Sequence, residues 1–164
     1  MSGRRFLLFG ADGQVGWELQ RALAPFGEVL PLTGAEVDLR DIAALQSAIR
    51  SAQPLAIVNA AAYTAVDKAE SEPDVAEAIN ATAAAVMAAE ARRLGAWLVH
   101  YSTDYVFDGT AAGAYREADE PNPLSVYGRT KLGGELAIAA SGVAHLTFRT
   151  SWVFGPHGGN FLKT

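Results

Sequence analysis

Short runs of apolar residues alternate along the chain with longer stretches in which apolar positions recur at helical spacing. We predict strands at the apolar runs and amphipathic helices at the stretches with the helical period. The predicted strands are Phe6–Phe9, Val29–Leu32, Ala56–Val58, Trp97–His100 and Val143–Phe148, with Trp152–Phe154 a candidate for a short sixth. The predicted helices are Gln14–Leu23, Ile42–Ile49, Pro73–Leu94 and Val126–Ala139.

Several residues mark the ends of these elements. We expect Asp41 to cap the second helix, Pro73 to open the third, and Gly142 to close the fourth. Glycine, proline and acidic residues crowd positions 108–123, where we predict a long loop. Strand–helix alternation repeated this often predicts an α/β fold of the Rossmann type, a doubly wound parallel sheet with helices on both faces.

Composition narrows the class of protein. The 164 residues are 50% hydrophobic and 19% charged, which is typical of one soluble globular domain. The net charge of −5 and the scattered basic residues argue against nucleic acid as a partner. The chain has no cysteine, which excludes disulfides, thiolate metal sites and a cysteine nucleophile.

Targeting and metal signals are also missing from the sequence. The apolar run near the N-terminus is too short for a signal peptide, and no run is long enough to span a membrane. We therefore expect a cytoplasmic protein without membrane contact. His100, His145 and His157 do not have the spacing of metal ligands, so we expect no metal site.

A glycine-rich run joins the first predicted strand to the first predicted helix. Gly10, Gly13 and Gly16 form a G-x-x-G-x-x-G pattern. We expect Gly10 to permit the tight turn, Gly13 to let a pyrophosphate approach the backbone, and Gly16 to let the helix pack against the sheet. The amide groups at the helix N-terminus then face the phosphates. In this strand–turn–helix setting the pattern predicts a dinucleotide-binding domain, which we extend over residues 1–164.

The sequence does not distinguish between NAD and NADP as the dinucleotide. An acidic residue at the tip of the second strand normally holds the ribose hydroxyls of NAD. Here the strand ends at Leu32 and Thr33, and a threonine leaves room for the 2′-phosphate of NADP, although no arginine stands next to it. Glu36 and Asp38 follow slightly later. We therefore expect either NADPH or NADH as cofactor.

Tyr127 and Lys131 lie four residues apart on a predicted helix, so both side chains project from one face. When hydride reaches a ketone carbon, the oxygen needs a proton donor, and a phenol can supply that proton. A neighbouring ammonium favours the ionised phenol, so we expect Lys131 to lower the pKa of Tyr127 and to bind the nicotinamide ribose. Thr103 follows the fourth strand, where residues point into the ligand crevice, and could share a hydrogen bond with Tyr127.

Five ordered motifs carry a resemblance to a known family. They are Gly13-Gln14-Val15-Gly16-Trp17-Glu18-Leu19, Asn59-Ala60-Ala61-Ala62-Tyr63-Thr64-Ala65-Val66-Asp67, Ser102-Thr103-Asp104-Tyr105-Val106-Phe107-Asp108-Gly109, Tyr127-Gly128-Arg129-Thr130-Lys131-Leu132 and Arg149-Thr150-Ser151-Trp152-Val153. Together they resemble the dTDP-4-dehydrorhamnose reductases of the extended short-chain dehydrogenase/reductase superfamily. The resemblance covers nearly the whole chain.

This resemblance implies reduction of a dTDP-linked 4-keto-6-deoxy sugar to dTDP-L-rhamnose with NADPH or NADH. It implies Tyr127 as proton donor, Lys131 as its electrostatic partner and Thr103 as the group that tunes proton transfer. The residues that the resemblance places along the cofactor are Gly10, Gly13, Gln14, Val15, Gly16, Asp38, Leu39, Ala62, Tyr63 and Thr64, together with Tyr127 and Lys131. Those that it places against the sugar are Thr103, Asp104 and Trp152.

The family continues into a smaller C-terminal domain that closes over the sugar nucleotide, and we expect that domain to be absent from this chain. A homodimer is conceivable. Two alternative functions stay open. One is a sugar-nucleotide epimerase or dehydratase, which would retain its NAD through the cycle. The other is a non-catalytic, NAD(P)-binding regulatory subunit, against which the intact Tyr127, Lys131 and Thr103 argue.

Overall fold

Five parallel strands form the sheet in the computed structural model, which describes residues 3–163. The strands are β1 (Arg5–Phe9), β2 (Glu28–Leu32), β3 (Ala56–Asn59), β4 (Trp97–Thr103) and β5 (His145–Thr150). Their order in the sheet is β2-β1-β3-β4-β5. The winding direction therefore reverses between β1 and β3, which is where ligands bind in open sheets of this kind.

Helices connect the strands. They are α1 (Gln14–Leu23), α2 (Ile42–Ala52), α3 (Val66–Ala69), α4 (Pro73–Glu77), α5 (Ala83–Leu94) and α6 (Val126–Ser141), with the π-helical turn η2 (Ala78–Thr82) and the 3-10 turns η1 (Ala24–Phe26) and η3 (Asp104–Val106). The three end signals are confirmed: the Asp41 carboxylate accepts from the Ala44 amide, Pro73 opens α4, and Gly142 ends α6 with φ 70°. None of the helices within residues 3–163 is long and apolar enough to cross a bilayer.

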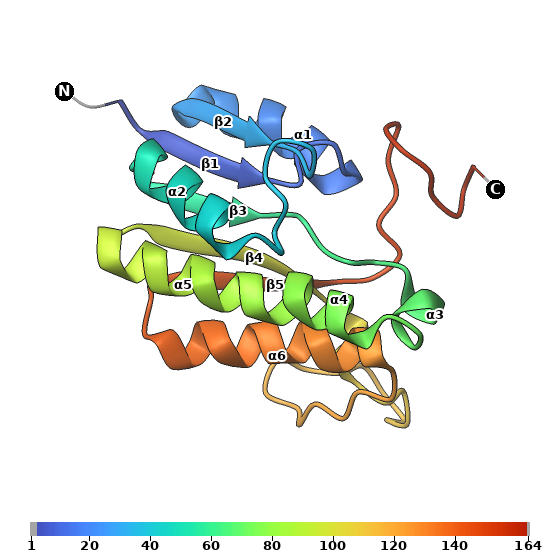
Figure 1. The fold of residues 1–164 in the computed structure, drawn as a ribbon. Coiled ribbons are helices and arrows are strands. Elements are labelled where there is room, and N and C mark those ends of the chain that lie inside the picture. Colours follow the sequence, from blue (N-terminus) through green and yellow to red (C-terminus); the bar gives the residue numbers. More distant parts are fainter. Residues whose placement is uncertain (1–2, 164) are drawn as a thin grey trace.

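The helices lie on both faces of the sheet, as Figure 1 shows, so the predicted α/β fold is confirmed. α2, α5 and α6 cover one face and bury the main core, which includes Leu7, Ile57 and Leu98 from the strands. α1 covers the other face, where Leu8 and Val58 are buried. Burial of this apolar surface is the main term that stabilises the sheet between its helices.

The second face is covered unevenly. α1 packs over β1 and β2, and Val99 and Tyr101 of β4 are partly buried on that face, whereas Leu146 and Phe148 of β5 are exposed. Phe148 is 46% exposed and Leu146 is 49% exposed, although both alternate correctly for a buried strand face. Leu146 and Phe148 therefore form an exposed apolar patch on this face of β5.

Two predicted elements differ from the structure. Trp152–Phe154 is not a strand, because Trp152 has φ +52° and leaves the extended region that a strand needs. The predicted helix at 73–94 keeps its ends but widens into the π-helical turn η2, in which the buried Asn80 lies. The predicted loop contains no helix or strand between residues 108 and 123, as expected.

Candidate functional site

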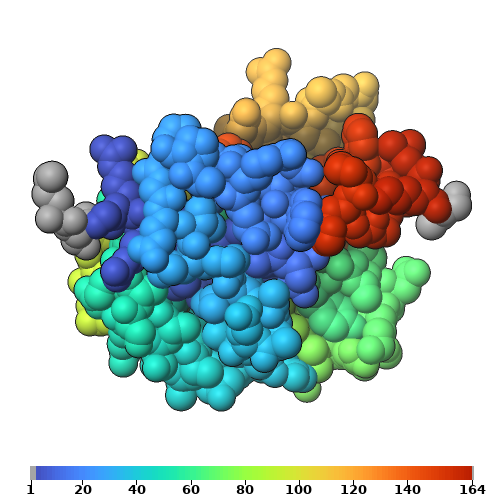
Figure 2. Space-filling model, turned by 90° about the horizontal axis from the view of Figure 1, so that it is seen from above, coloured from blue at the N-terminus to red at the C-terminus, as the bar shows by residue number. Residues whose placement is uncertain are grey.

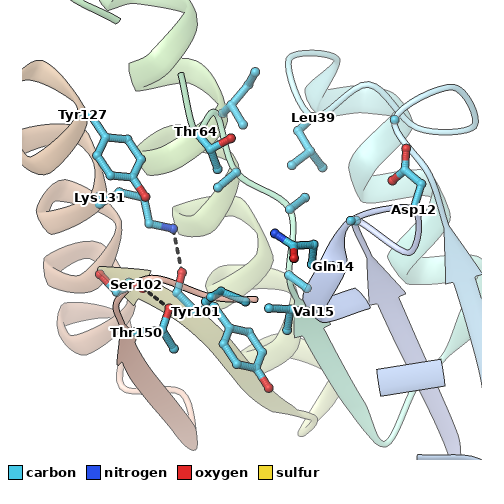
Figure 3. A pocket seen from close by; sticks show the side chains of 18 of the residues that line it. Asp12, Gln14, Val15, Leu39, Thr64, Tyr101, Ser102, Tyr127, Lys131 and Thr150 are labelled. Carbon is cyan, nitrogen blue, oxygen red and sulfur yellow. Dashed lines mark hydrogen bonds between the residues drawn. The ribbon is translucent and has the colours of Figure 1, made fainter. Parts of the chain in front are cut away.

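A cavity of about 590 Å³ opens at the carboxyl ends of the strands, at the point where the sheet reverses (Figure 3). It is lined by Gly10, Asp12, Gly13, Gln14, Val15, Gly34, Val37, Asp38, Leu39, Arg40, Ala60, Ala61, Ala62, Thr64, Ile79, Tyr101, Ser102, Tyr127, Lys131, Thr150 and Val153. This volume lies within the range of ordinary cofactor and small-molecule sites.

The glycine-rich turn forms one wall of this cavity. Gly10 has φ +76°, and a Cβ there would lie 2.6 Å from the Ala61 amide nitrogen, so only glycine fits. A Cβ on Gly16 would lie 2.0 Å from the Gly10 carbonyl oxygen, which shows how closely α1 packs against the turn. Gly13 occupies the N-cap of α1 and offers no side-chain hydrogen bond to the helix. The first amide groups of α1 therefore remain available to an anionic ligand.

Asp38 and Arg40, from the connection that follows β2, also line the large cavity. The Arg40 guanidinium donates two hydrogen bonds from Nε and one from Nη2 to the Asp38 carboxylate, at 2.6 to 3.0 Å. These bonds lower the pKa of Asp38 to about 2. Arg40 is not among the residues that the sequence indicated, because it lies seven positions after Thr33 and not beside it. A connection that folds back toward the strand tip brings Arg40 to the cavity.

Helix α6 positions the Tyr127 and Lys131 pair. Ser125 caps the helix by accepting from the Gly128 amide at 3.0 Å, which sets where the first turn begins. A Cβ on Gly128 would lie 2.3 Å from the Tyr105 carbonyl oxygen, so α6 approaches the segment after β4 more closely than other residues would allow. Tyr127 and Lys131 consequently project together into the cavity (Figure 3).

The Lys131 side chain is 2% exposed, and its Nζ donates to the Tyr101 carbonyl at 2.6 Å. Burial lowers the pKa of Lys131 to about 8, although Glu135 opposes the change. The pKa of Tyr127 is raised, chiefly because burial disfavours the phenolate, while a hydrogen bond with Thr103 opposes the rise. The expectation that Lys131 lowers the pKa of Tyr127 is therefore wrong for this structure. The Lys131 ammonium is directed at a carbonyl, and the phenol keeps its proton.

A second cavity of about 310 Å³ lies beyond Tyr127. Thr103 and Asp104 line it from the end of β4, and Trp152 lines it from the segment after β5. Thr103 donates to Asp104 at 3.1 Å, and Asp104 in turn accepts from Ser151 at 2.6 Å. Tyr127 lines both cavities, so its phenol stands at their junction.

Most of the residues that the sequence indicated meet around these two cavities, with two exceptions. Gly16 is buried under the turn and lines neither cavity. Tyr63 lines neither cavity either, because its hydroxyl donates to the Glu72 carboxylate at 2.8 Å. Tyr101 and Thr150 line the large cavity as well, although no sequence motif indicated a role for either. Their position at the ends of β4 and β5 is the signal that could have identified them.

Glu70 provides a further contact that fixes the start of α6. Its carboxylate accepts from the Val126 amide at 2.7 Å, across 56 residues of sequence. We expect Glu70→Ala to lower the free energy of unfolding by about 1 kcal/mol, since one helix N-terminal amide loses its partner. Urea titration measures this change. Glu117→Ala in the exposed loop is the matched control, and an equal loss in both variants contradicts the capping role.

The chain matches the family model described as the RmlD substrate binding domain over residues 4–164. It is 52% identical over 160 residues to the dTDP-4-dehydrorhamnose reductase of Burkholderia thailandensis, covering 98% of this chain and 54% of that protein. It is 51% identical to the reductase of Salmonella typhimurium, covering 96% of this chain and 54% of that protein. The chain thus spans about half the length of the curated relatives that it matches.

Solved structures agree with the sequence comparison. The dTDP-4-dehydrorhamnose reductase of Bacillus anthracis, solved with NADP, superposes with a TM-score of 0.93 at 37% identity, covering 98% of this chain and 57% of that one. The UDP-glucose 4-epimerase of Thermus thermophilus, with a TM-score of 0.84 at 23% identity over 93% of this chain and 56% of that one, shows the fold alone. The family model extends over nearly all of the chain, and the chain therefore belongs to the family described as the RmlD substrate binding domain.

Proposed function

We propose that this chain is the NAD(P)-binding part of an oxidoreductase that reduces the 4-keto group of dTDP-4-dehydro-L-rhamnose to dTDP-L-rhamnose. One observation carries the proposal: Tyr127 stands at the junction of a cavity with a glycine-rich wall and a second cavity lined by Thr103 and Asp104. The names of relatives at about 50% identity support the substrate.

The large cavity fits an NAD(P) cofactor. Its wall is a turn in which a Cβ at Gly10 would collide with backbone, and the N-terminus of α1 lies above it without a side-chain cap. A pyrophosphate binds in such a cradle through backbone amides. We propose Gly10, Gly13, Gln14 and Val15 for the pyrophosphate. We propose Asp38 and Leu39 for the adenine, Ala62 and Thr64 for the nicotinamide side, and Lys131 for the nicotinamide ribose.

The bound nicotinamide supplies the hydride. Tyr127 holds a proton on its phenol, and its raised pKa keeps that proton in place at neutral pH. A phenol at the boundary of the two cavities can donate it to the carbonyl oxygen of a substrate in the smaller cavity. Thr103 binds the phenol and orients it. The Lys131 ammonium, which donates to the Tyr101 carbonyl at 2.6 Å, lines the same cavity as the phenol and is proposed to hold the nicotinamide ribose beside it.

We propose that the sugar-nucleotide site is formed only in part by the described residues. We propose that Thr103, Asp104 and Trp152 contact the sugar, with a further part of the protein closing over it. Trp152 is 73% exposed and meets Phe161 edge-on, with ring centroids 5.3 Å apart. An exposed indole beside a cavity is suited to stacking on a sugar or nucleotide face.

Dinucleotide binding by the chain itself is the direct test. We expect isothermal titration of the 164-residue chain to give saturable binding of NADH or NADPH, because the large cavity is built entirely from its residues. Tight copurification of NAD through the whole purification favours the epimerase or dehydratase alternative, whereas ready exchange favours the reductase. Failure to bind either dinucleotide contradicts the proposal.

A further inference from the structure

The segment that follows β5 crosses the molecule and returns to the glycine-rich turn near the opposite end of the sequence. Figure 2 shows it lying against the N-terminal part of the chain, and Figure 1 shows its path above the carboxyl ends of the strands. We call residues 155–160 the strap. Within the strap Gly155, His157 and Asn160 are partly buried, while its other residues are exposed.

His157 makes two contacts with the turn and the helix after it. Its imidazole stacks on Trp17 of α1, with ring centroids 4.4 Å apart and planes 10° from parallel. Its Nε2 lies 3.0 Å from the Asp12 carbonyl oxygen. A carbonyl can only accept, so Nε2 carries the hydrogen and donates it. The bond opposes rotation of the peptide between Asp12 and Gly13.

Asn160 makes the third contact. Its Nδ2 donates to Gln14 Oε1 at 3.1 Å and to the Gly155 carbonyl at 2.9 Å, which ties the strap to itself and to the first residue of α1. Gly158 lies close to the same side chain, since a Cβ there would meet Gln14 Cγ at 3.1 Å. The strap therefore holds both Asp12 and Gln14, and both of these line the large cavity.

The strap supports the part of the turn that the hydrogen bonds of the turn itself do not reach. Its glycines leave the backbone free to adopt many conformations, and Gly13 provides no side-chain cap. The Gly10 and Ala11 amides donate to the Leu32 carbonyl at 3.0 and 3.1 Å, the Gly13 amide donates to the Gly10 carbonyl at 3.1 Å, and Gln20 Nε2 donates to the Ala11 carbonyl at 2.9 Å. These bonds involve neither Asp12 nor Gln14. The strap fixes its other end. A turn that is ordered before the ligand arrives loses less entropy on binding.

We propose that His157 and Asn160 are positioning residues for dinucleotide binding, which they support by holding Asp12 and Gln14 in the conformation that receives the pyrophosphate. This inference rests on the proposed function. The strap begins two residues after Val153, a residue that lines both cavities.

The test compares His157→Ala and Asn160→Ala with His145→Ala, a matched control in which the imidazole lies on β5. Titration of the chain with NADH and NADPH is expected to show a dissociation constant raised by about 3- to 10-fold in each strap variant, as for the loss of one hydrogen bond. His145→Ala should leave it unchanged. Hydrogen exchange at residues 10–16 of the ligand-free protein should be faster in the strap variants only.

Further variants separate positioning from general stability. His157→Phe keeps a ring on Trp17 but loses the bond to the Asp12 carbonyl. Its affinity for the dinucleotide should lie between those of the unaltered chain and His157→Ala. Asn160→Ala should have no further effect in a Gln14→Ala background, because it acts through that side chain. In the native polypeptide, KM for the cofactor should rise while kcat stays constant.

The outcomes are distinct. If the unaltered chain binds neither dinucleotide, the proposed function fails. If it binds and both strap variants bind equally well, the function stands and the role of the strap is wrong. The role is also wrong if weaker binding only follows a lower unfolding midpoint, with unchanged exchange at residues 10–16.

Discussion

Tyr127→Phe is expected to lower the turnover of the native polypeptide by about 10²- to 10⁴-fold, because it removes the proposed proton donor. This corresponds to a barrier higher by about 3 to 5 kcal/mol. The ring itself stays in place: Tyr127 meets Tyr105 edge-on, with centroids 5.6 Å apart, and Phe preserves that contact. Affinity for the dinucleotide and the free energy of unfolding should therefore change little.

The measurement is steady-state reduction of the dTDP-linked keto sugar, with dinucleotide binding followed separately. Tyr115→Phe is the control, because it likewise removes a phenolic hydroxyl, in this case one that donates to the Asp108 carboxylate at 2.8 Å. It lies outside both cavities and should keep its turnover. Full turnover in Tyr127→Phe, with the control equally active, removes Tyr127 from the proton-donor role.

Lys131→Met is expected to raise the free energy of unfolding at neutral pH while lowering turnover by about 10²-fold. Lys131 is 2% exposed, and burial lowers the pKa of its ammonium from the ordinary value of 10.5 to about 8. Keeping it charged in the folded protein therefore costs about 3 kcal/mol. The bond to the Tyr101 carbonyl, worth about 1 kcal/mol, is lost with it. A methionine of similar length fills the space without the charge, so the net expected gain is about 1 to 3 kcal/mol.

The pH dependence provides the sharper check. Between the folded pKa, about 8, and the unfolded value, 10.5, the unfolded chain holds a proton on Lys131 that the folded chain has released. Stability of the unaltered protein therefore rises with pH through this window, and that rise is lost in Lys131→Met. The advantage of the variant should shrink as the pH increases.

Urea titrations at pH 7 and pH 10 measure both effects. Lys68→Met is the control, since Lys68 is exposed and forms an ion pair with Glu72. It should show neither the gain at pH 7 nor the altered pH dependence. A Lys131→Met protein that is less stable than the unaltered one at pH 7 contradicts the claim that burial of this charge opposes folding.

The sequence was sufficient for the sheet and for the turn. Strands and helices alternate in clear apolar patterns, and glycine is required at positions 10 and 16 because a Cβ at either position would collide with backbone atoms. The four-residue spacing of Tyr127 and Lys131 on one helix placed both on one face. Such features depend on neighbours in the chain, and local rules describe them well.

Other features depended on contacts between distant residues. The pKa of Tyr127 could not be predicted from its spacing to Lys131, because burial and the partner of the ammonium decide it. In the π-helical turn, Asn80 accepts from the Tyr63 amide and donates to the Thr130 hydroxyl, contacts across 17 and 50 residues that no local pattern indicates. The predicted strand at Trp152–Phe154 failed because a strand needs a partner and an extended backbone, and apolar residues alone supply neither.

The sequence by itself therefore determined the order of the elements, the glycine-rich turn and the placement of Tyr127 and Lys131 on one helix face, since each follows from short-range spacing. Only the tertiary structure decided which groups meet across the chain: Arg40 at the cavity, Glu70 at the start of α6, and the strap at Asp12 and Gln14. The physical reason is that protonation, capping and turn order depend on burial and on through-space partners. Packing brings those partners together across as many as 146 residues.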